Sequence, residues 1–356
     1  MVGGMRFFLI FFCLLASTQE AFAQMLDYSD PTSHQQRVVP KRQYNNGSAR
    51  AENNGRMVKG KSSKYTGNSD YDLDIGIEGG YRTSQLKWNI GGDGVSVPNI
   101  LSELEWENVN GYEVKPSIEY TRKTGSFKGI NVQASVNKSI TTSGKNQDSD
   151  YAGNNRTAEF SRSNNTSEAG HSEGFSASIG YAFNFSGNRK QNVARFTALV
   201  GYAMQNQKFV MHDGFQTIPA TGAFPNLVSS YDMELSMPFV GADFYSQFAD
   251  VHSIKLNTKI YRGTFNGTGH WNLRTDFAQP DSFTQEADGY GLIFGAKYGW
   301  NFYPDLKLTL ATNLNYFKAK SGTDIVYFAD GSTGESNFRE VRFLSTDYLA
   351  GLNYSF

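Results

Sequence analysis

The chain has 356 residues, a formal net charge of -1, 14% aromatic residues and one cysteine. Its near-neutral charge argues against nucleic-acid binding through a general basic field. With Cys13 as the only cysteine, intramolecular disulfides and cysteine-based metal sites are excluded.

Residues 1–23 have the three parts of a cleavable secretory leader. Arg6 supplies the positive charge, residues 7–16 form an apolar run, and Ala21-Phe22-Ala23 provides a small-x-small cleavage site. The segment 24–70 that follows is poor in large apolar residues and rich in Asn, Gly, Ser, Lys and Arg. We expect a flexible periplasmic segment there, acting either as a solvated linker or in binding peptidoglycan or a partner.

Residues 71–356 alternate apolar with polar, as in the central series Ile130, Val132, Ala134 and Val136, whose neighbours are polar. No run reaches the ~18 apolar residues of a spanning helix, so a membrane protein of this kind must be a closed barrel. The sequence therefore predicts an all-β fold, a transmembrane antiparallel up-and-down barrel. About ten strands are expected, at 71–90, 100–122, 127–142, 173–187, 193–213, 229–249, 252–273, 283–303, 306–322 and 338–356.

Short connections alternate along the chain with long ones at 143–172, 214–228, 274–282 and 323–337. In bacterial barrels the short turns are periplasmic and the long loops extracellular, which predicts an outer-membrane protein with both termini in the periplasm. The last strand ends on Phe356, as expected of a strand that the barrel-assembly machinery inserts. A soluble sandwich or lipocalin-like barrel would alternate similarly, but the leader and Phe356 disfavour it. A ten-stranded lumen leaves little room for a channel, which directs attention to the loops.

The second long loop carries paired carboxylates, Asp148 and Asp150, and the seventh strand leaves the membrane through His270. Two aspartates one residue apart project to the same side of an extended chain, and their proximity raises one pKa. Such a pair suits general-base work on water, with His270 completing the site. A solvated turn or a loose cation site is the alternative. No cofactor and no metal site is predicted.

The mature region after residue 71 resembles the omptins, which are ten-stranded outer-membrane endopeptidases. Four segments carry the resemblance: 79–88 (GGYRTSQLKW), 148–151 (DSDY), 224–226 (FPN) followed by Met237-Pro238, and His270-Trp271. The resemblance implies that Asp148 and Asp150 activate water with His270 as the base, that substrates are peptides or proteins cleaved beside basic residues, and that lipopolysaccharide is required.

The chain departs from the omptin pattern next to His270. Thr268 stands where an aspartate orients the histidine, and Asn266 replaces an acidic pocket residue. An orienting carboxylate is worth about 10⁴ in turnover in a Ser-His-Asp enzyme. Of the acids nearby, Asp276, Asp281, Glu286 and Asp288 are candidates to replace it. Strict alternation places His270 on the face of Ile260, so the assignment requires a β-bulge near Gly267 or Gly269.

The loops look still more like barrels of the Protochlamydia outer membrane protein type, for whose relatives a porin role has been suggested. The segments 99–104, 213–217 and 272–277 carry this resemblance. By analogy with omptins, Tyr202, Lys208 and Arg262, with Arg274, are candidate lipopolysaccharide contacts, and Tyr202 also suits an interfacial aromatic belt. Two predictions stay open: a surface endopeptidase using Asp148, Asp150 and His270, or a non-enzymatic barrel acting as a narrow solute pore, an adhesin or a structural protein.

Overall fold

The computed structural model describes residues 70–186, 193–249 and 251–356. The predicted leader and, apart from Asp70, the predicted periplasmic segment lie outside these residues. In the part of the chain that is described, no helix is long and apolar enough to cross a membrane.

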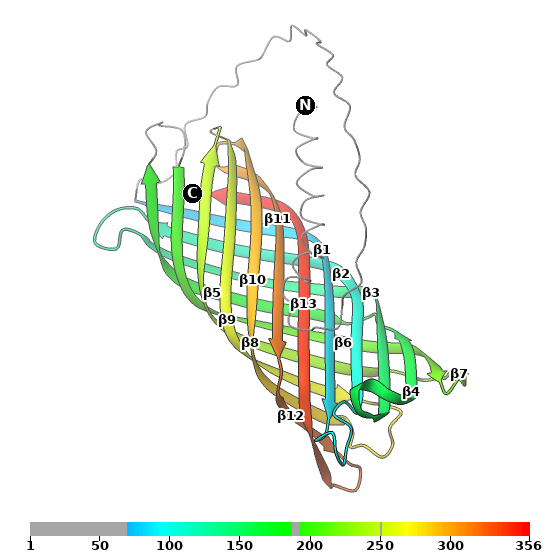
Figure 1. Ribbon diagram of the computed structural model, residues 1–356. Helices are drawn as coiled ribbons and strands as arrows, with labels where there is room; N and C mark the ends of the chain where they lie inside the picture. Colours follow the sequence, from blue (N-terminus) through cyan, green and yellow to red (C-terminus); the bar gives the residue numbers. More distant parts are fainter. Residues whose placement is uncertain (1–69, 187–192, 250) are drawn as a thin grey trace, which may run out of the picture. The chain divides into compact units, whose positions relative to one another are not determined.

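Ten long antiparallel strands form a closed barrel, because the first strand pairs with the last (Figure 1). They are β1 (Tyr71–Gly91), β2 (Ser102–Arg122), β3 (Ile130–Gly153), β5 (His171–Ser186), β6 (Val193–Ile218), β8 (Ser229–Phe248), β9 (His252–His270), β10 (Phe283–Tyr303), β11 (Leu306–Ala319) and β13 (Thr333–Ser355). Closure leaves no unpaired sheet edge, as a spanning barrel requires. The predicted fold class is confirmed.

Three shorter strands lie in segments that were expected to be loops. β4 (Thr157–Thr166) continues the line of β5 between β3 and β6, and β12 (Gly322–Tyr327) continues the line of β11 between β10 and β13. β7 (Gly222–Ala223) pairs with β6. The prediction of long loops at 143–172 and 323–337 is therefore wrong. Both segments are largely polar, so they lack the apolar alternation that marks a strand against lipid.

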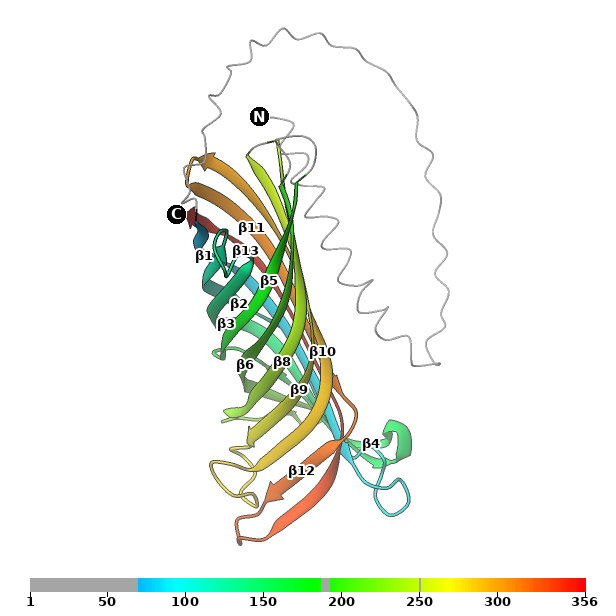
Figure 2. The same cartoon turned by 90° about the vertical axis from the view of Figure 1, so that its left-hand side faces the viewer.

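The barrel has two distinct ends, which the two views of the ribbon show (Figure 1 and Figure 2). We call the end with the connections 92–101, 154–156, 219–228, 271–282 and 328–332 the loop end. The opposite end, where Tyr71 begins the first strand and Phe356 follows the last, is the terminal end. β4, β7 and β12 all belong to the loop end.

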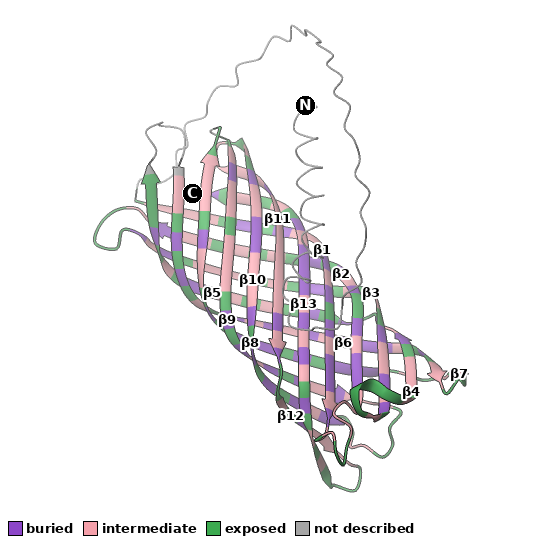
Figure 3. Cartoon of the chain, viewed as in Figure 1, coloured by how far each residue is buried: buried purple, intermediate pink, exposed green. Residues whose placement is uncertain are grey.

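The wall of the terminal half has the polarity of a membrane barrel. Its outward residues are exposed and apolar, for example Ile77 on β1, Val114 on β2 and Ile140 on β3, whereas the neighbouring Glu78 and Glu113 are buried inside (Figure 3). Apolar side chains on the outside suit lipid and polar ones on the inside suit a hydrated lumen. This half is the membrane-spanning part.

In the loop half the polarity is reversed. Leu104 and Trp106 of β2 are buried inside the barrel, and Glu105 and Glu107 lie on the outer side. On β2 the change coincides with a β-bulge at Asn108, whose φ of 50° is left-handed and where the register with both neighbouring strands shifts. One extra residue moves every following side chain to the other face. The loop half is thus built like a water-soluble barrel around an apolar core.

Candidate functional site

Aromatic side chains from opposite walls meet in the middle of the loop half. Trp88 of β1 lies 5.6 Å from Tyr231 of β8 and 5.8 Å from Phe283 of β10, measured between ring centroids. Trp106 of β2 lies 5.4 Å from Tyr231 and 5.1 Å from Phe209 of β6. Because β1 and β2 do not pair with β8, these contacts cross the lumen. We call Trp88, Trp106, Phe209, Tyr231 and Phe283 the lumen seal.

Each residue of the lumen seal is at most 7% exposed, so the rings fill the space between the walls. Further inward residues extend the apolar core on either side of the seal, namely Leu86, Leu104, Leu235, Phe265, Phe317, Phe338 and Phe343. The rings pack closely between the walls, as side chains do in a protein interior. The sequence pattern did not predict the seal, although the inward positions of 231–239 are uniformly large and apolar.

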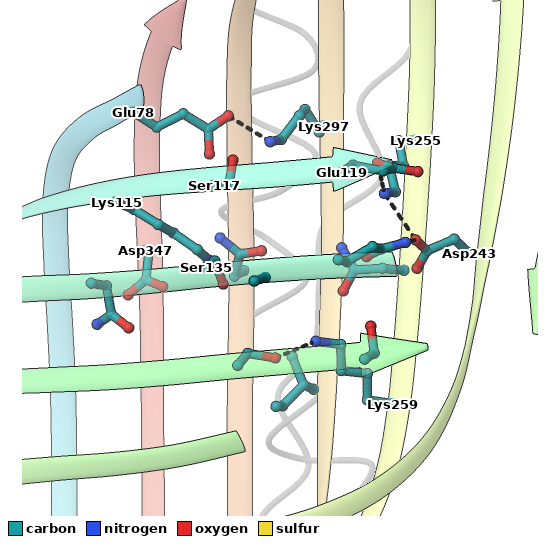
Figure 4. Close-up of a pocket in the computed structure, with 18 of the residues that line it drawn as sticks. Glu78, Lys115, Ser117, Glu119, Ser135, Asp243, Lys255, Lys259, Lys297 and Asp347 are labelled. Carbon is teal, nitrogen blue, oxygen red and sulfur yellow. Dashed lines mark hydrogen bonds and ion pairs between the residues drawn. The ribbon is translucent and has the colours of Figure 1, made fainter. Parts of the chain in front are cut away.

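Below the lumen seal, the terminal half of the barrel contains a polar cavity of about 230 Å³ (Figure 4). Its lining runs from Ala203 and Met237, which belong to the apolar core, to Asp74 and Asn353 near the terminal end. We call it the lumen cavity. The sequence pattern does not reveal this cavity, because the inward lysines and acids of a barrel are scattered over the whole chain.

Ion pairs join the walls of the lumen cavity. Lys255 of β9 contacts Glu119 of β2 at 2.7 Å and Asp243 of β8 at 2.9 Å. Lys297 of β10 contacts Glu78 of β1 at 2.7 Å (Figure 4). Since β2 and β9 are not neighbours, these pairs act as struts across the lumen. Their partners satisfy charges that would be costly to bury alone.

A buried ion triad that joins neighbouring strands centres on Arg82 of β1. Its Nη1 lies 3.1 Å from Glu113 and 2.9 Å from Asp347, on the strands to either side. All three residues are less than 8% exposed. This triad lies between the lumen cavity and the apolar core above it.

The paired carboxylates predicted from the sequence lie together on the inner side of β3 in the loop half. Asp148 is opposite Leu104 of β2 and Ser163 of β4, and Asp150 is two residue pairs further on. The lipid-facing series of this strand ends at Ile140, so both aspartates are outside the membrane-spanning part. Their position inside the mouth of the barrel agrees with the predicted shared side.

Burial raises the pKa of Asp148 to about 8, and the negative charge of Asp150 adds to the effect. Burial also raises the pKa of Asp150, and hydrogen bonds from Ser102 and Ser161 oppose that rise. Oδ1 of Asp148 is buried without a hydrogen-bond partner. Below about pH 8 Asp148 is therefore a neutral acid beside a second carboxyl group, an arrangement that can give and take protons.

The cation that faces this carboxyl pair is Arg274, from the connection between β9 and β10. Its positive charge lowers the pKa of both aspartates, although burial outweighs it. Arg274 is itself held by Asp276 at 2.7 Å and stacks 3.9 Å above the ring of Phe277. The sequence predicts Arg274 only as a lipid contact and gives no signal for this role, because the loop conformation is not encoded in strand alternation.

His270 does not face the carboxyl pair. β9 pairs with β8 and β10 in an unbroken register, so the β-bulge that its catalytic assignment requires is not formed. By alternation His270 shares the outward face of Ile260. Gly267 and Gly269 point inward, where a Cβ would lie 1.8 Å from the Tyr231 hydroxyl and 2.1 Å from the Phe283 ring. These glycines make room for the lumen seal and do not mark a bulge.

Two of the proposed replacements for the missing carboxylate share the outward face with His270 and do not reach the inner face of the barrel. Glu286 and Asp288 of β10 are exposed on the outward face, and Asp288 contacts Arg262 at 3.4 Å. Thr268 and Asn266 share that outward face. Among the described residues, no three His, Cys, Asp or Glu side chains gather in a way that would hold a metal ion.

The candidate lipopolysaccharide contacts all lie on the outer wall. Tyr202 and Lys208 are on β6 and Arg262 is on β9, with β8 between them. The Tyr202 hydroxyl donates to Ser236 Oγ at 3.0 Å, and Lys208 pairs with Asp232 at 3.1 Å. Their exposure on one side of the wall is compatible with lipid contact, which stays a prediction.

Residues 76–356 match the sequence profile of the family described as Protochlamydia outer membrane protein. The chain belongs to this family. A search of curated proteins gave no match.

Among solved structures, the barrel is similar to the outer membrane protease OmpT from Escherichia coli, with a TM-score of 0.66 and 14% identity over 83% of this chain and 100% of that chain. A major outer membrane protein from Thermus thermophilus matches with a TM-score of 0.30 and 10% identity over 80% of this chain and 99% of that one. The first likeness shows an omptin-like fold and says nothing about activity. Family and fold together support location in the outer membrane.

Proposed function

We propose that the protein is a sealed outer-membrane barrel that works by binding at its loop end on the cell surface, as an adhesin or structural contact. The observation that carries this proposal is the lumen seal. Trp88 and Trp106 contact Tyr231 across the lumen, which supports a lumen closed to solutes at this level. We therefore expect the function to depend on the surfaces that face water.

The orientation of the barrel is part of the proposal. The connections at the terminal end are shorter, as between Tyr303 and Leu306, and those at the loop end are longer. In bacterial barrels the longer connections are extracellular. The loop half is accordingly placed outside the cell, where its outward polar residues meet water, and both barrel termini are periplasmic.

Apolar side chains at the loop end support a binding role. Val95 is 90% exposed in the connection after β1, and Val228 and Leu273 are 55% and 43% exposed in two other connections. Exposed apolar residues on loops lower the free energy of a complex when a partner covers them. Three such residues on separate loops could contact a partner, and this kind of binding does not require a catalytic site.

Surface binding is tested with bacteria that display the protein, counted after washing on cultured eukaryotic cells. We expect fewer retained cells for a Val95→Ser, Val228→Ser, Leu273→Ser variant than for the unchanged protein. Phe127→Ser, at the terminal end and 70% exposed, is the matched control and should leave retention unchanged. Equal retention of the triple variant and the unchanged protein would refute the proposal.

An endopeptidase is the competing function, and its support is the carboxyl pair Asp148 and Asp150 inside the mouth. With His270 on the outer face, the pair would have to act without an imidazole base. Refolded protein with lipopolysaccharide is incubated with a diverse peptide library and analysed by mass spectrometry. Cleavage that disappears in an Asp148→Asn, Asp150→Asn variant would establish a peptidase and overturn the binding proposal.

A narrow solute pore is the second candidate, favoured by the polar lumen cavity beneath the lumen seal. Single-channel conductance in planar bilayers distinguishes a solute pore from a sealed, surface-binding barrel. The unchanged protein should give no conductance steps, whereas Trp88→Ala, Phe283→Ala should open a path into the lumen cavity. Steps from the unchanged protein would make it a channel, and silence of the double variant would eliminate the lumen as a conduit.

A further inference from the structure

The lumen cavity contains more cations than carboxylates. Its lining includes seven Lys and Arg residues and five Asp and Glu residues. The acids have partners: Glu78, Glu119, Asp243 and Asp347 form the struts and the triad described above, and Asp74 accepts a hydrogen bond from Ser355. Three lining lysines, Lys115, Lys259 and Lys307, form none of the ion pairs found among the described residues.

Two of these lysines enter the lumen cavity from opposite walls, Lys115 from β2 and Lys259 from β9 (Figure 4). Lys259 Nζ donates to Ser176 Oγ on β5 at 3.0 Å and lies 4.4 Å from the ring of Phe239. Both contacts are with neutral groups, and the negative charge that acts on Lys259, that of Asp243, is already paired with Lys255. Lys115 makes no hydrogen bond among the described residues.

Two carboxylates, Glu78 and Glu113, interact electrostatically with Lys115, and both also have other partners. Glu78 is its direct partner across the β1–β2 ladder, but its Oε1 contacts Lys297. Glu113, on the same strand, receives hydrogen bonds from Arg82 and Asn137. A confined cation without a counter-charge is costly, and a second one in the same enclosure adds repulsion. An anion between the two lysines removes both costs.

We propose that the lumen cavity binds a small oxyanion, of the sulfate or phosphate type, between Lys115 and Lys259. The hydroxyls of Ser117, Ser135 and Ser176 line the same space and supply neutral donors. At about 230 Å³ the cavity accommodates such an ion with several waters. The lining reaches Asp74 and Asn353, so the ion enters from the terminal end and the lumen seal prevents its exit at the loop end.

The site is independent of the surface-binding proposal, since it needs neither an open lumen nor a partner at the loop end. It is tested by following thermal unfolding of the full-length mature protein in detergent during titration with sodium sulfate or sodium phosphate. A ligand that binds only the folded state raises the melting temperature with its concentration. A third titration uses glycerol phosphate. It distinguishes binding of a lipid-type phosphoryl headgroup from binding of the free ion.

The variants are Lys115→Met and Lys259→Met, which keep side-chain length and remove charge. Each should weaken binding roughly tenfold or more, because a charge-assisted hydrogen bond is lost. Lys145→Met, an exposed lysine of the loop half, is the control and should bind like the unchanged protein. If a methionine variant fails to fold, Lys115→Gln and Lys259→Gln replace it.

Two results would overturn the site. One is an equal rise in melting temperature with sodium chloride at the same ionic strength, which is general screening. The other is an unchanged response to sulfate in both lysine variants. A response to phosphate or glycerol phosphate that both variants lose would support it and identify which form of the phosphoryl group binds better.

Discussion

The two halves of the barrel interior follow opposite rules within one continuous sheet. In the terminal half, Glu78, Arg82 and Asp347 lie inside while apolar side chains face outward. In the loop half, Trp106 and Tyr231 lie inside while Glu105 and Asp232 face outward. The same strands form both halves, so the surroundings of the wall account for the difference: lipid around one half and water around the other.

This comparison explains how each half is stabilised. The loop half gains free energy from burial of aromatic and aliphatic side chains, as a soluble domain does. The terminal half gains little from its interior, where desolvation of charges offsets much of their attraction. Its struts instead fix which strands face each other. Substitutions in the two halves should therefore have different signatures.

The largest effect is expected in the apolar half, for Trp88→Ala. Trp88 is 2% exposed and contacts rings on three other strands. Its loss leaves a cavity and should lower the free energy of unfolding by about 3–5 kcal/mol. Urea unfolding in lipid vesicles measures the change. Val95→Ala, at an exposed position, should change stability by no more than about 0.5 kcal/mol; similar losses for both variants would argue against an apolar core.

A somewhat smaller effect is expected in the charged half, for Arg82→Met. The substitution leaves Glu113 and Asp347 buried without their cation, which should lower the free energy of unfolding by about 3 kcal/mol. A second change, Glu113→Gln, should largely restore the free energy of unfolding of the Arg82→Met variant. No such rescue is expected for Trp88→Ala. A double variant no more stable than the single one would show that packing, not charge, dominates this position.

Asp148 should make stability depend on pH. In the unfolded chain it ionises near pH 4, whereas in the fold it keeps its proton up to about pH 8. Between these values the native state binds more protons, so its contribution to stability falls as pH rises. Asp148→Asn should flatten this part of the profile of unfolding free energy against pH. The same change at exposed Asp281 should leave the profile unaltered; an unaltered profile for Asp148→Asn would contradict the assigned burial.

The smallest effect is expected for His270→Ala. Because His270 shares the outward face of β9 with Ile260, its removal should change the free energy of unfolding by no more than about 0.5 kcal/mol. The same denaturation series measures it, with Thr268→Ala as a neighbour on the same face. A substantial loss of stability would place the imidazole among buried groups, against the register.

How far the sequence predicted the structure follows from what alternation encodes. Apolar residues that recur at every second position and face lipid, such as Val132 and Val136, predicted the ten strands and the barrel. Where water surrounds the outer face and polar side chains also lie on the inner face, as at residues 143–166, Ser, Thr and Asn replaced the apolar residues and strands were taken for loops. Asp148 and Asp150 were correctly placed on one side, but alternation could not show which side of the wall.

The error at His270 has a related cause. Gly267 and Gly269 are compatible with a bulge or with close packing against rings, and both are local patterns in the sequence. What decides between them is Tyr231 on β8 and Phe283 on β10, the latter beyond a twelve-residue connection. Contacts across a lumen are set by the closure of the whole sheet, so they cannot be derived from one strand.

The bulge at Asn108 makes β2 sensitive to chain length in a way that composition does not show. Deleting this one residue would put residues 102–107 out of phase with the lower part of the strand, turning Trp106 toward water and Glu105 and Glu107 into the apolar core. Substitutions at Asn108 preserve the phase, whereas an insertion or deletion inverts it. In this barrel a single-codon gap in β2 would do more damage than most replacements of the same residue.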